Sequence, residues 1–125
     1  MPTSRFRTLA GLGAVPLALA LATAAPASAT AKPATTKLAF TSGVCPEAIY
    51  AFTCTASWTG GTSPYTVLWT GVHDAYFSAP AYSTTALSAS VSGDCVPDTY
   101  YEVTIKVTDA TGTSIIEGMS APCDA

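Results

Sequence analysis

The single histidine of the chain, His73, is the side chain best suited to reaction chemistry, because an imidazole can act as a general base near neutral pH. Asp74 follows it directly. Adjacent strand residues point to opposite faces, so this carboxylate is poorly placed to orient the imidazole. The sequence also lacks the Gly-x-Ser-x-Gly pattern of a hydrolase nucleophile. We therefore expect no catalytic residue, and a minimal enzyme using His73 is the least favoured functional hypothesis.

The acidic residues add no strong candidate for a catalytic or metal-binding site. Asp94 and Asp98 flank a cysteine in a polar segment, where solvated turn acids are the simplest explanation. Asp109 with Thr111 could bind a calcium ion weakly, but the run Asp-Ala-Thr-Gly is typical of a hairpin turn, which is the favoured interpretation. We expect no metal and no cofactor.

Four cysteines in a short exported chain predict two disulfides. A zinc site is the alternative, but there is no Cys-x-x-Cys pair and only one histidine. Three pairings are open. Cys45 ends the first expected strand and Cys54 lies in the second, while Cys95 precedes and Cys123 follows the last two strands. Hairpins at both places favour the pairs Cys45–Cys54 and Cys95–Cys123.

The first 29 residues have the pattern of a secretory signal peptide. Arg5 and Arg7 form a basic start, residues 9–24 are apolar, and small residues in an Ala-x-Ala arrangement end at Ala29. A membrane anchor is the alternative, but the apolar run is shorter than the ~20 residues that a bilayer span needs. We expect cleavage after Ala29, then a flexible leader over 30–36, one domain over 37–125, and a secreted, extracellular protein.

The charge balance limits the class of partner. The chain after Ala29 keeps all eight acidic residues but loses both arginines. This argues against nucleic acid and against anionic membrane surfaces, both of which need a basic patch. We expect a soluble monomer whose partner is an extracellular protein or carbohydrate.

The chain must place these residues on short strands. Residues 101–108 alternate strictly between apolar and polar, which is the pattern of a half-buried strand. A turn at 109–112 and a return strand at 113–119 complete a hairpin in which either Ile115 or Ile116 faces the core. Further strands are expected at 37–43, 50–58, 65–70, 75–79 and 87–92. About seven strands with regular turns predict an all-β, antiparallel β-sandwich.

Two segments resemble a known group. Residues 60–69 (GGTSPYTVLW) resemble the GGTxPYxYxW segment of bacterial immunoglobulin-like domains of the PKD type, and residues 101–112 (YEVTIKVTDATG) resemble their YxVxVxVTDxxG segment. The resemblance implies a seven-stranded immunoglobulin-like sandwich with Trp69 in the core and Tyr101 opening the sixth strand. The four cysteines are not a general feature of that group. It implies an extracellular setting but no single activity, because such modules serve as spacers, adhesion units and accessories to hydrolases.

In this fold the loops 59–64 and 109–112 meet at one end, as antibody loops do. Trp58, Tyr65 and Thr111 are therefore the candidate ligand patch. For Trp58 itself, packing at the core or its edge is the favoured interpretation, and a flat face presented to a sugar or a protein is the alternative. A second aromatic group, formed by Tyr76, Phe77 and Tyr82, is expected to pack over an irregular edge.

The leading functional hypothesis is a secreted, non-catalytic binding module of immunoglobulin-like fold. The second is a small secreted inhibitor of a protease or glycosidase, which suits the size, the export signal and the disulfides.

Overall fold

The computed structural model describes residues 36–124. The predicted signal peptide (1–29) and most of the predicted leader (30–36) lie outside the described residues. Within them the chain forms nine strands, two more than expected. The additional strands are β2, of two residues, and β6, of three, which are too short to show a periodic pattern in the sequence, whereas β5 lies within the strand expected at 75–79. The strands are β1 (Ala39–Val44), β2 (Ala48–Ile49), β3 (Ala51–Thr59), β4 (Tyr65–His73), β5 (Ala75–Tyr76), β6 (Tyr82–Thr84), β7 (Ser88–Cys95), β8 (Thr99–Thr108) and β9 (Ser114–Asp124).

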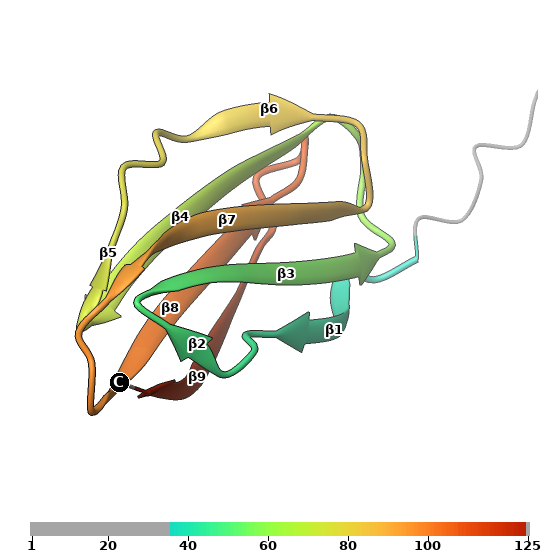
Figure 1. Cartoon of the computed structure of the whole chain (residues 1–125). Helices are drawn as coiled ribbons and strands as arrows, with labels where there is room; N and C mark the ends of the chain where they lie inside the picture. Colours follow the sequence, from blue (N-terminus) through green and yellow to red (C-terminus); the bar gives the residue numbers. More distant parts are fainter. Residues whose placement is uncertain (1–35, 125) are drawn as a thin grey trace, which may run out of the picture. The chain divides into compact units, whose positions relative to one another are not determined.

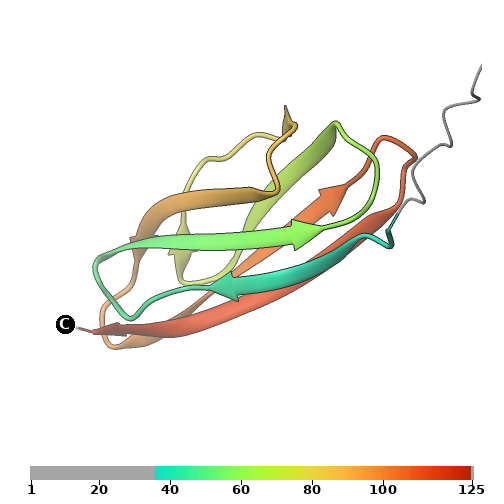
Figure 2. The same cartoon turned by 90° about the vertical axis from the view of Figure 1, so that its right-hand side faces the viewer.

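The strands form two curled, facing sheets that are joined at one corner (Figures 1 and 2). One sheet contains β5, β7, β3 and β1, and the other contains β9, β8, β4 and β6. The two-residue strand β2 pairs with both β3 and β9 and so links the sheets. The β2–β9 pair is parallel, and the other pairs among the described strands are antiparallel. The prediction of an all-β sandwich is thus confirmed.

The core lies between the sheets and follows the predicted alternation. Along β3 and β8 every second side chain is buried, while the residues between them are exposed or half-buried. Phe52 stacks on Tyr101 with ring centroids 4.5 Å apart, which joins the two sheets directly. Full burial of a large apolar side chain contributes roughly 1.5–3 kcal/mol. The inward residues of these strands are Phe52, Cys54, Ala56, Trp58, Tyr101, Val103, Ile105 and Val107.

The register of the last strand is settled by its pairing with β8. Ile115 lies opposite Val107 and is half-buried, whereas Ile116 lies opposite Lys106 and is exposed. Ile115 is therefore the residue that faces inward. The strand also extends beyond the predicted end at residue 119, to Asp124, because Met119, Ala121 and Cys123 continue the buried alternation.

Two disulfides staple the sandwich, with the pairing expected from the hairpins. Cys45 is joined to Cys54, and Cys95 is joined to Cys123. Cys54 and Cys123 are fully buried, so both bridges belong to the core rather than to the surface. Disulfides of this kind are typical of an oxidising environment outside the cytoplasm. Among the described residues, no helix is long and apolar enough to cross a membrane.

Candidate functional site

The predicted ligand patch is not a surface. Trp58 is 2% exposed and Tyr65 is 4% exposed, so the ligand patch is wrong for Tyr65, whereas the favoured core packing of Trp58 is confirmed. Their rings pack edge to face with centroids 5.7 Å apart, and the Tyr65 hydroxyl donates a hydrogen bond to the Gly60 carbonyl at 2.8 Å. The physical reason is parity, because alternate residues of a strand share a face. Trp58 shares its buried face with Cys54, as the favoured interpretation of core packing expects. Thr111 alone of the three is exposed.

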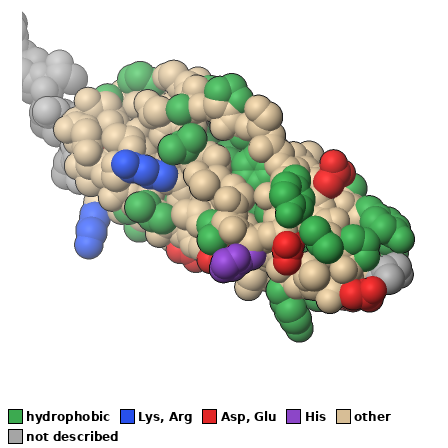
Figure 3. All heavy atoms as spheres, turned by 90° about the vertical axis from the view of Figure 1, so that its left-hand side faces the viewer, with side chains coloured by type: hydrophobic (Ala, Val, Ile, Leu, Met, Phe, Trp, Pro, Cys, Tyr) green, Lys and Arg blue, Asp and Glu red, His purple; other side chains and the backbone are tan. Residues whose placement is uncertain are grey.

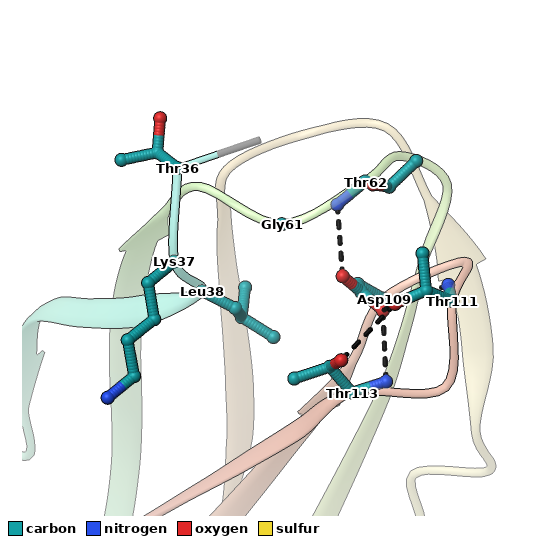
Figure 4. A pocket seen from close by; sticks show the side chains of 8 residues that line it. All are labelled: Thr36, Lys37, Leu38, Gly61, Thr62, Asp109, Thr111 and Thr113. Atoms are coloured by element: carbon teal, nitrogen blue, oxygen red, sulfur yellow. Dashed lines mark hydrogen bonds between the residues drawn. The ribbon is translucent and has the colours of Figure 1, made fainter. Parts of the chain in front are cut away.

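The loop end of the sandwich, formed by the β3–β4 loop, the β8–β9 turn and residues 36–38, is organised by a buried carboxylate (Figure 4). Asp109 is 7% exposed and accepts four hydrogen bonds. Its Oδ1 accepts from Thr111 N (2.9 Å), Thr111 Oγ1 (2.6 Å) and Thr113 N (3.0 Å). Its Oδ2 accepts from Thr62 N (3.1 Å), which lies in the other loop. One side chain thus shapes its own turn and holds the neighbouring loop against it.

These donors stabilise the charged form of the carboxylate. The Thr111 hydroxyl is the largest cause and, together with the backbone N–H groups of Thr113, Thr62 and Thr111, it lowers the pKa of Asp109 below its ordinary value, against the opposing effect of burial. The predicted hairpin-turn role of Asp109 agrees with these bonds. The sequence did not indicate the bond to Thr62, because it joins residues far apart in the chain.

A pocket of about 340 Å³ lies beside this carboxylate. Its polar groups are largely used within the protein: both Asp109 oxygens accept hydrogen bonds, and Gly61 N donates to the Thr36 carbonyl at 2.7 Å. Figure 4 shows the Lys37 side chain extending away from Asp109. Within the described range, no group of three or more His, Cys, Asp or Glu side chains could hold a metal ion. The pocket residues are Thr36, Lys37, Leu38, Gly61, Thr62, Asp109, Thr111 and Thr113.

His73 lies at the surface and does not pair with its sequence neighbour. Its imidazole Nε2 is 4.0 Å from a carboxylate oxygen of Glu102, which faces it across the β4–β8 pair, and the His73 side chain is 73% exposed. An ion pair at this distance and exposure contributes little. Asp74 instead adopts a positive φ of 42°, and its carbonyl accepts a hydrogen bond from Val96 N.

The opposite end of the sandwich carries four of the large exposed side chains. We call it the disulfide end, because Cys95 and Cys123 lie there together with the β2–β3 and β7–β8 turns. Four apolar or aromatic residues there are more than half exposed: Ile49 (66%), Tyr50 (57%), Tyr76 (61%) and Tyr100 (71%). This concentration was missed from the sequence. Its positions depend on which strands pair, and the sequence alone does not give the pairing.

The second predicted aromatic group is divided by the structure. Phe77 is half-buried and packs edge to face on Phe52, with ring centroids 6.1 Å apart, as expected for packing over an edge. Tyr82 lies on β6 and is 41% exposed, whereas Tyr76 on β5 belongs to the disulfide end. Only Phe77 therefore serves the core.

Comparison with known proteins extends the account of the fold. No family model matches the sequence, and no curated protein matches it. Among solved structures, the chain is similar to a conjugative transposon lipoprotein from Bacteroides eggerthii DSM 20697, with a TM-score of 0.50 and 8% sequence identity. The match covers 67% of this chain and 93% of that one. At this identity the likeness shows a shared all-β fold and carries no information on what either protein binds.

Proposed function

We propose that this chain is a secreted, non-catalytic immunoglobulin-like module that binds an extracellular protein or polysaccharide. The observation that carries the proposal is the exposure of Ile49, Tyr50, Tyr76 and Tyr100 at one end of a disulfide-stapled sandwich. Aromatic residues in this setting are enriched at interfaces, because a Tyr ring supplies a large contact area at low entropic cost.

The export signal predicted at residues 1–29 and the two disulfides support a location outside the cell. The immunoglobulin-like, PKD-type assignment is supported by the two motif segments. Residues 60–69 contain the loop into β4 and end on the buried Trp69, while residues 101–112 contain most of β8 and its turn. The core position of Trp69 agrees with the resemblance, whereas Tyr101 is the third residue of β8 and does not open its strand.

A macromolecular ligand fits the surfaces better than a small one. Small-molecule sites are concave and combine apolar walls with a few free polar groups. In the loop-end pocket the carboxylate accepts hydrogen bonds from the protein itself, so it offers little to a ligand. The disulfide end presents Ile49, Tyr76 and Tyr100 outward on strands, and Tyr50 on the β2–β3 turn. A partner would meet a preorganised surface there and would lose little entropy in ordering it.

A binding experiment with a matched variant tests the proposal. The oxidised mature domain would be immobilised and challenged with fractionated extracellular proteins and with cell-wall polysaccharides. We expect saturable retention of a component of one fraction, and weaker retention by a Tyr50→Ser/Tyr100→Ser variant of unchanged melting temperature. Thr53→Ala on the exposed face of β3 is the control and should retain the component fully. Retention of nothing from any fraction contradicts the binding function, and turnover of a test substrate would contradict its non-catalytic character.

A further inference from the structure

A single row of exposed residues crosses five strands at the disulfide end. Tyr76 on β5 lies opposite Asp94 on β7, Asp94 lies opposite Ala51 on β3, and Ala51 lies opposite Ile49 on β2. Ile49 in turn lies beside Asp124 on β9. We call these five residues the end row. All five are exposed, and residues paired in this way point to the same face of the sheet.

Two of the five residues in the end row are carboxylates, and each has an apolar or aromatic neighbour in the row. Neighbouring strands are about 4.7–4.9 Å apart, so the row is about 19 Å wide. Tyr76 is followed by Asp94, and Ile49 is followed by Asp124. Each of these pairs places an aromatic ring or an aliphatic side chain next to a carboxylate. Tyr50 adjoins the row at the β2–β3 turn, where its carbonyl accepts a hydrogen bond from Cys95 N at 2.7 Å.

The charge around the row is negative. Glu47, Asp74 and Asp98 lie in the turns that border it. The two lysines of the described residues lie elsewhere, Lys37 in the loop-end pocket and Lys106 in the middle of β8. In Figure 3 most of the visible acidic side chains lie to the right, between hydrophobic ones, and the lysines lie to the left. Among the described residues this end is therefore acidic and has no lysine or arginine, and its one basic side chain, His73, faces Glu102.

Two of these carboxyl groups oppose each other directly. A hydrogen bond between the Glu47 and Asp124 side chains, and the charge of Asp124, raise the pKa of Glu47. Within the described residues no lysine or histidine forms an ion pair with either of them. A cationic partner would relieve this repulsion, because an opposite charge within a few ångströms favours the ionised form.

We propose that the end row binds arginine side chains of a protein partner, an inference that rests on the proposed binding function. A guanidinium can stack on the Tyr76 ring while it donates to the Asp94 carboxylate beside it. A second arginine can lie along Ile49 and donate to Asp124. Arginine fits better than lysine, because its planar group both stacks and makes two parallel hydrogen bonds to one carboxylate. Anionic polymers and anionic membranes are repelled by the same charges.

The test is nuclear magnetic resonance titration of the oxidised domain, with an alternating arginine–serine dodecapeptide as the probe. We expect saturable shifts centred on the backbone amides of the end row, with a dissociation constant of about 10–1,000 μM at low ionic strength. The same peptide with citrulline in place of arginine keeps the shape and loses the charge, so it should produce no saturable shifts. The lysine–serine peptide should bind at least about threefold more weakly.

Two charge-matched variants separate a site from general attraction. Asp94→Asn/Asp124→Asn removes two negative charges from the end row, and Glu102→Gln/Glu117→Gln removes two from β8 and β9 outside it. We expect the first to weaken peptide binding at least about tenfold and the second to weaken it less than about twofold. Both pairs of side chains lie at the surface or close to it, and equal melting temperatures will show that the folds are intact.

Equal weakening by the two variants, shifts spread over the whole surface, or equal binding of the citrulline peptide would overturn the arginine site. None of these results touches the proposed binding function, which fails only if the domain retains no extracellular component. Retention of such a component with equal strength by wild type and Asp94→Asn/Asp124→Asn would likewise overturn the arginine site and leave the binding function standing.

Discussion

The loop end and the disulfide end of this sandwich use their carboxylates in opposite ways. At the loop end, the Asp109 carboxylate is buried and accepts four hydrogen bonds from its own chain. At the disulfide end, Asp94 and Asp124 are exposed, and Glu47 and Asp124 face each other. A carboxylate whose acceptor sites are filled internally contributes to stability, whereas an exposed one beside an aromatic ring remains free for a partner.

The analogy with antibody loops points to the wrong end of the sandwich for exposed aromatic side chains. That analogy places the ligand surface at the loop end, where Trp58 and Tyr65 turned out to be buried. Fold similarity locates loops in space, but the hydrogen bonds of each loop decide whether its polar groups are available. In this molecule the available groups lie at the end where the short strands β2 and β5 finish the sheet.

The largest expected effect comes from the disulfide end. Replacing Cys95 and Cys123 with serine should destabilise the domain by about 3.6 kcal/mol, and the same change at Cys45 and Cys54 by about 2.7 kcal/mol, because the first bridge closes the longer loop. Urea denaturation of each double variant measures the difference in unfolding free energy. The reverse order would show that chain entropy does not govern these bridges.

The next largest effect belongs to the loop end. Asp109→Ala leaves the N–H groups of Thr62, Thr111 and Thr113 without their acceptor, so the melting temperature should fall by about 5–10 °C. Asp94→Ala, which removes an exposed acid at the other end, is the control and should change the melting temperature by less than about 2 °C. Equal effects of the two changes would remove the distinction between the ends.

Acidification should act on the same group. Because the folded pKa of Asp109 is lowered, its contribution to stability is present above the ordinary value of 3.8 and is lost as the pH falls through the folded pKa. The difference in unfolding midpoint between wild type and Asp109→Asn should therefore shrink between about pH 5 and pH 2. A difference that stays constant over this range would show that the negative charge itself is not what the loop end uses.

The smallest effect concerns the backbone at the disulfide end. Tyr50 has a φ of 65°, a conformation that costs a non-glycine residue roughly 1–2 kcal/mol. Tyr50→Gly should relieve this cost and introduce a similar entropic one, so the melting temperature should stay within about 4 °C of wild type. Thermal denaturation measures it. A much larger fall would mean that the Tyr50 ring supports the fold and is not free for a partner.

Much of the fold was predictable because it depends on local alternation. The strict period of two over 101–108 located β8, and the spacing of the cysteines around expected hairpins gave both bridges. The same alternation placed Trp58 on the face of Cys54, so the sequence already held the signal that it is buried.

The proposed binding surface was less predictable, because it is built from cross-strand register. The end row joins Tyr76, Asp94, Ala51, Ile49 and Asp124, which are spread over 76 positions of sequence numbering from Ile49 to Asp124. Their adjacency depends on β2 and β5, and strands of two residues carry no periodic pattern. The bond from Thr62 to Asp109 was missed for the same reason, since no local pattern connects two separate loops.

Amide hydrogen exchange at the loop end tests the contrast between the two ends most directly. The N–H groups of Thr62, Thr111 and Thr113 lie outside the strands, yet each donates to the Asp109 carboxylate. We predict that all three exchange at least about tenfold more slowly than unbonded loop amides, and that Asp109→Asn removes much of this protection. Exchange of these three amides in the wild-type protein at the rate of free loop amides would contradict the account.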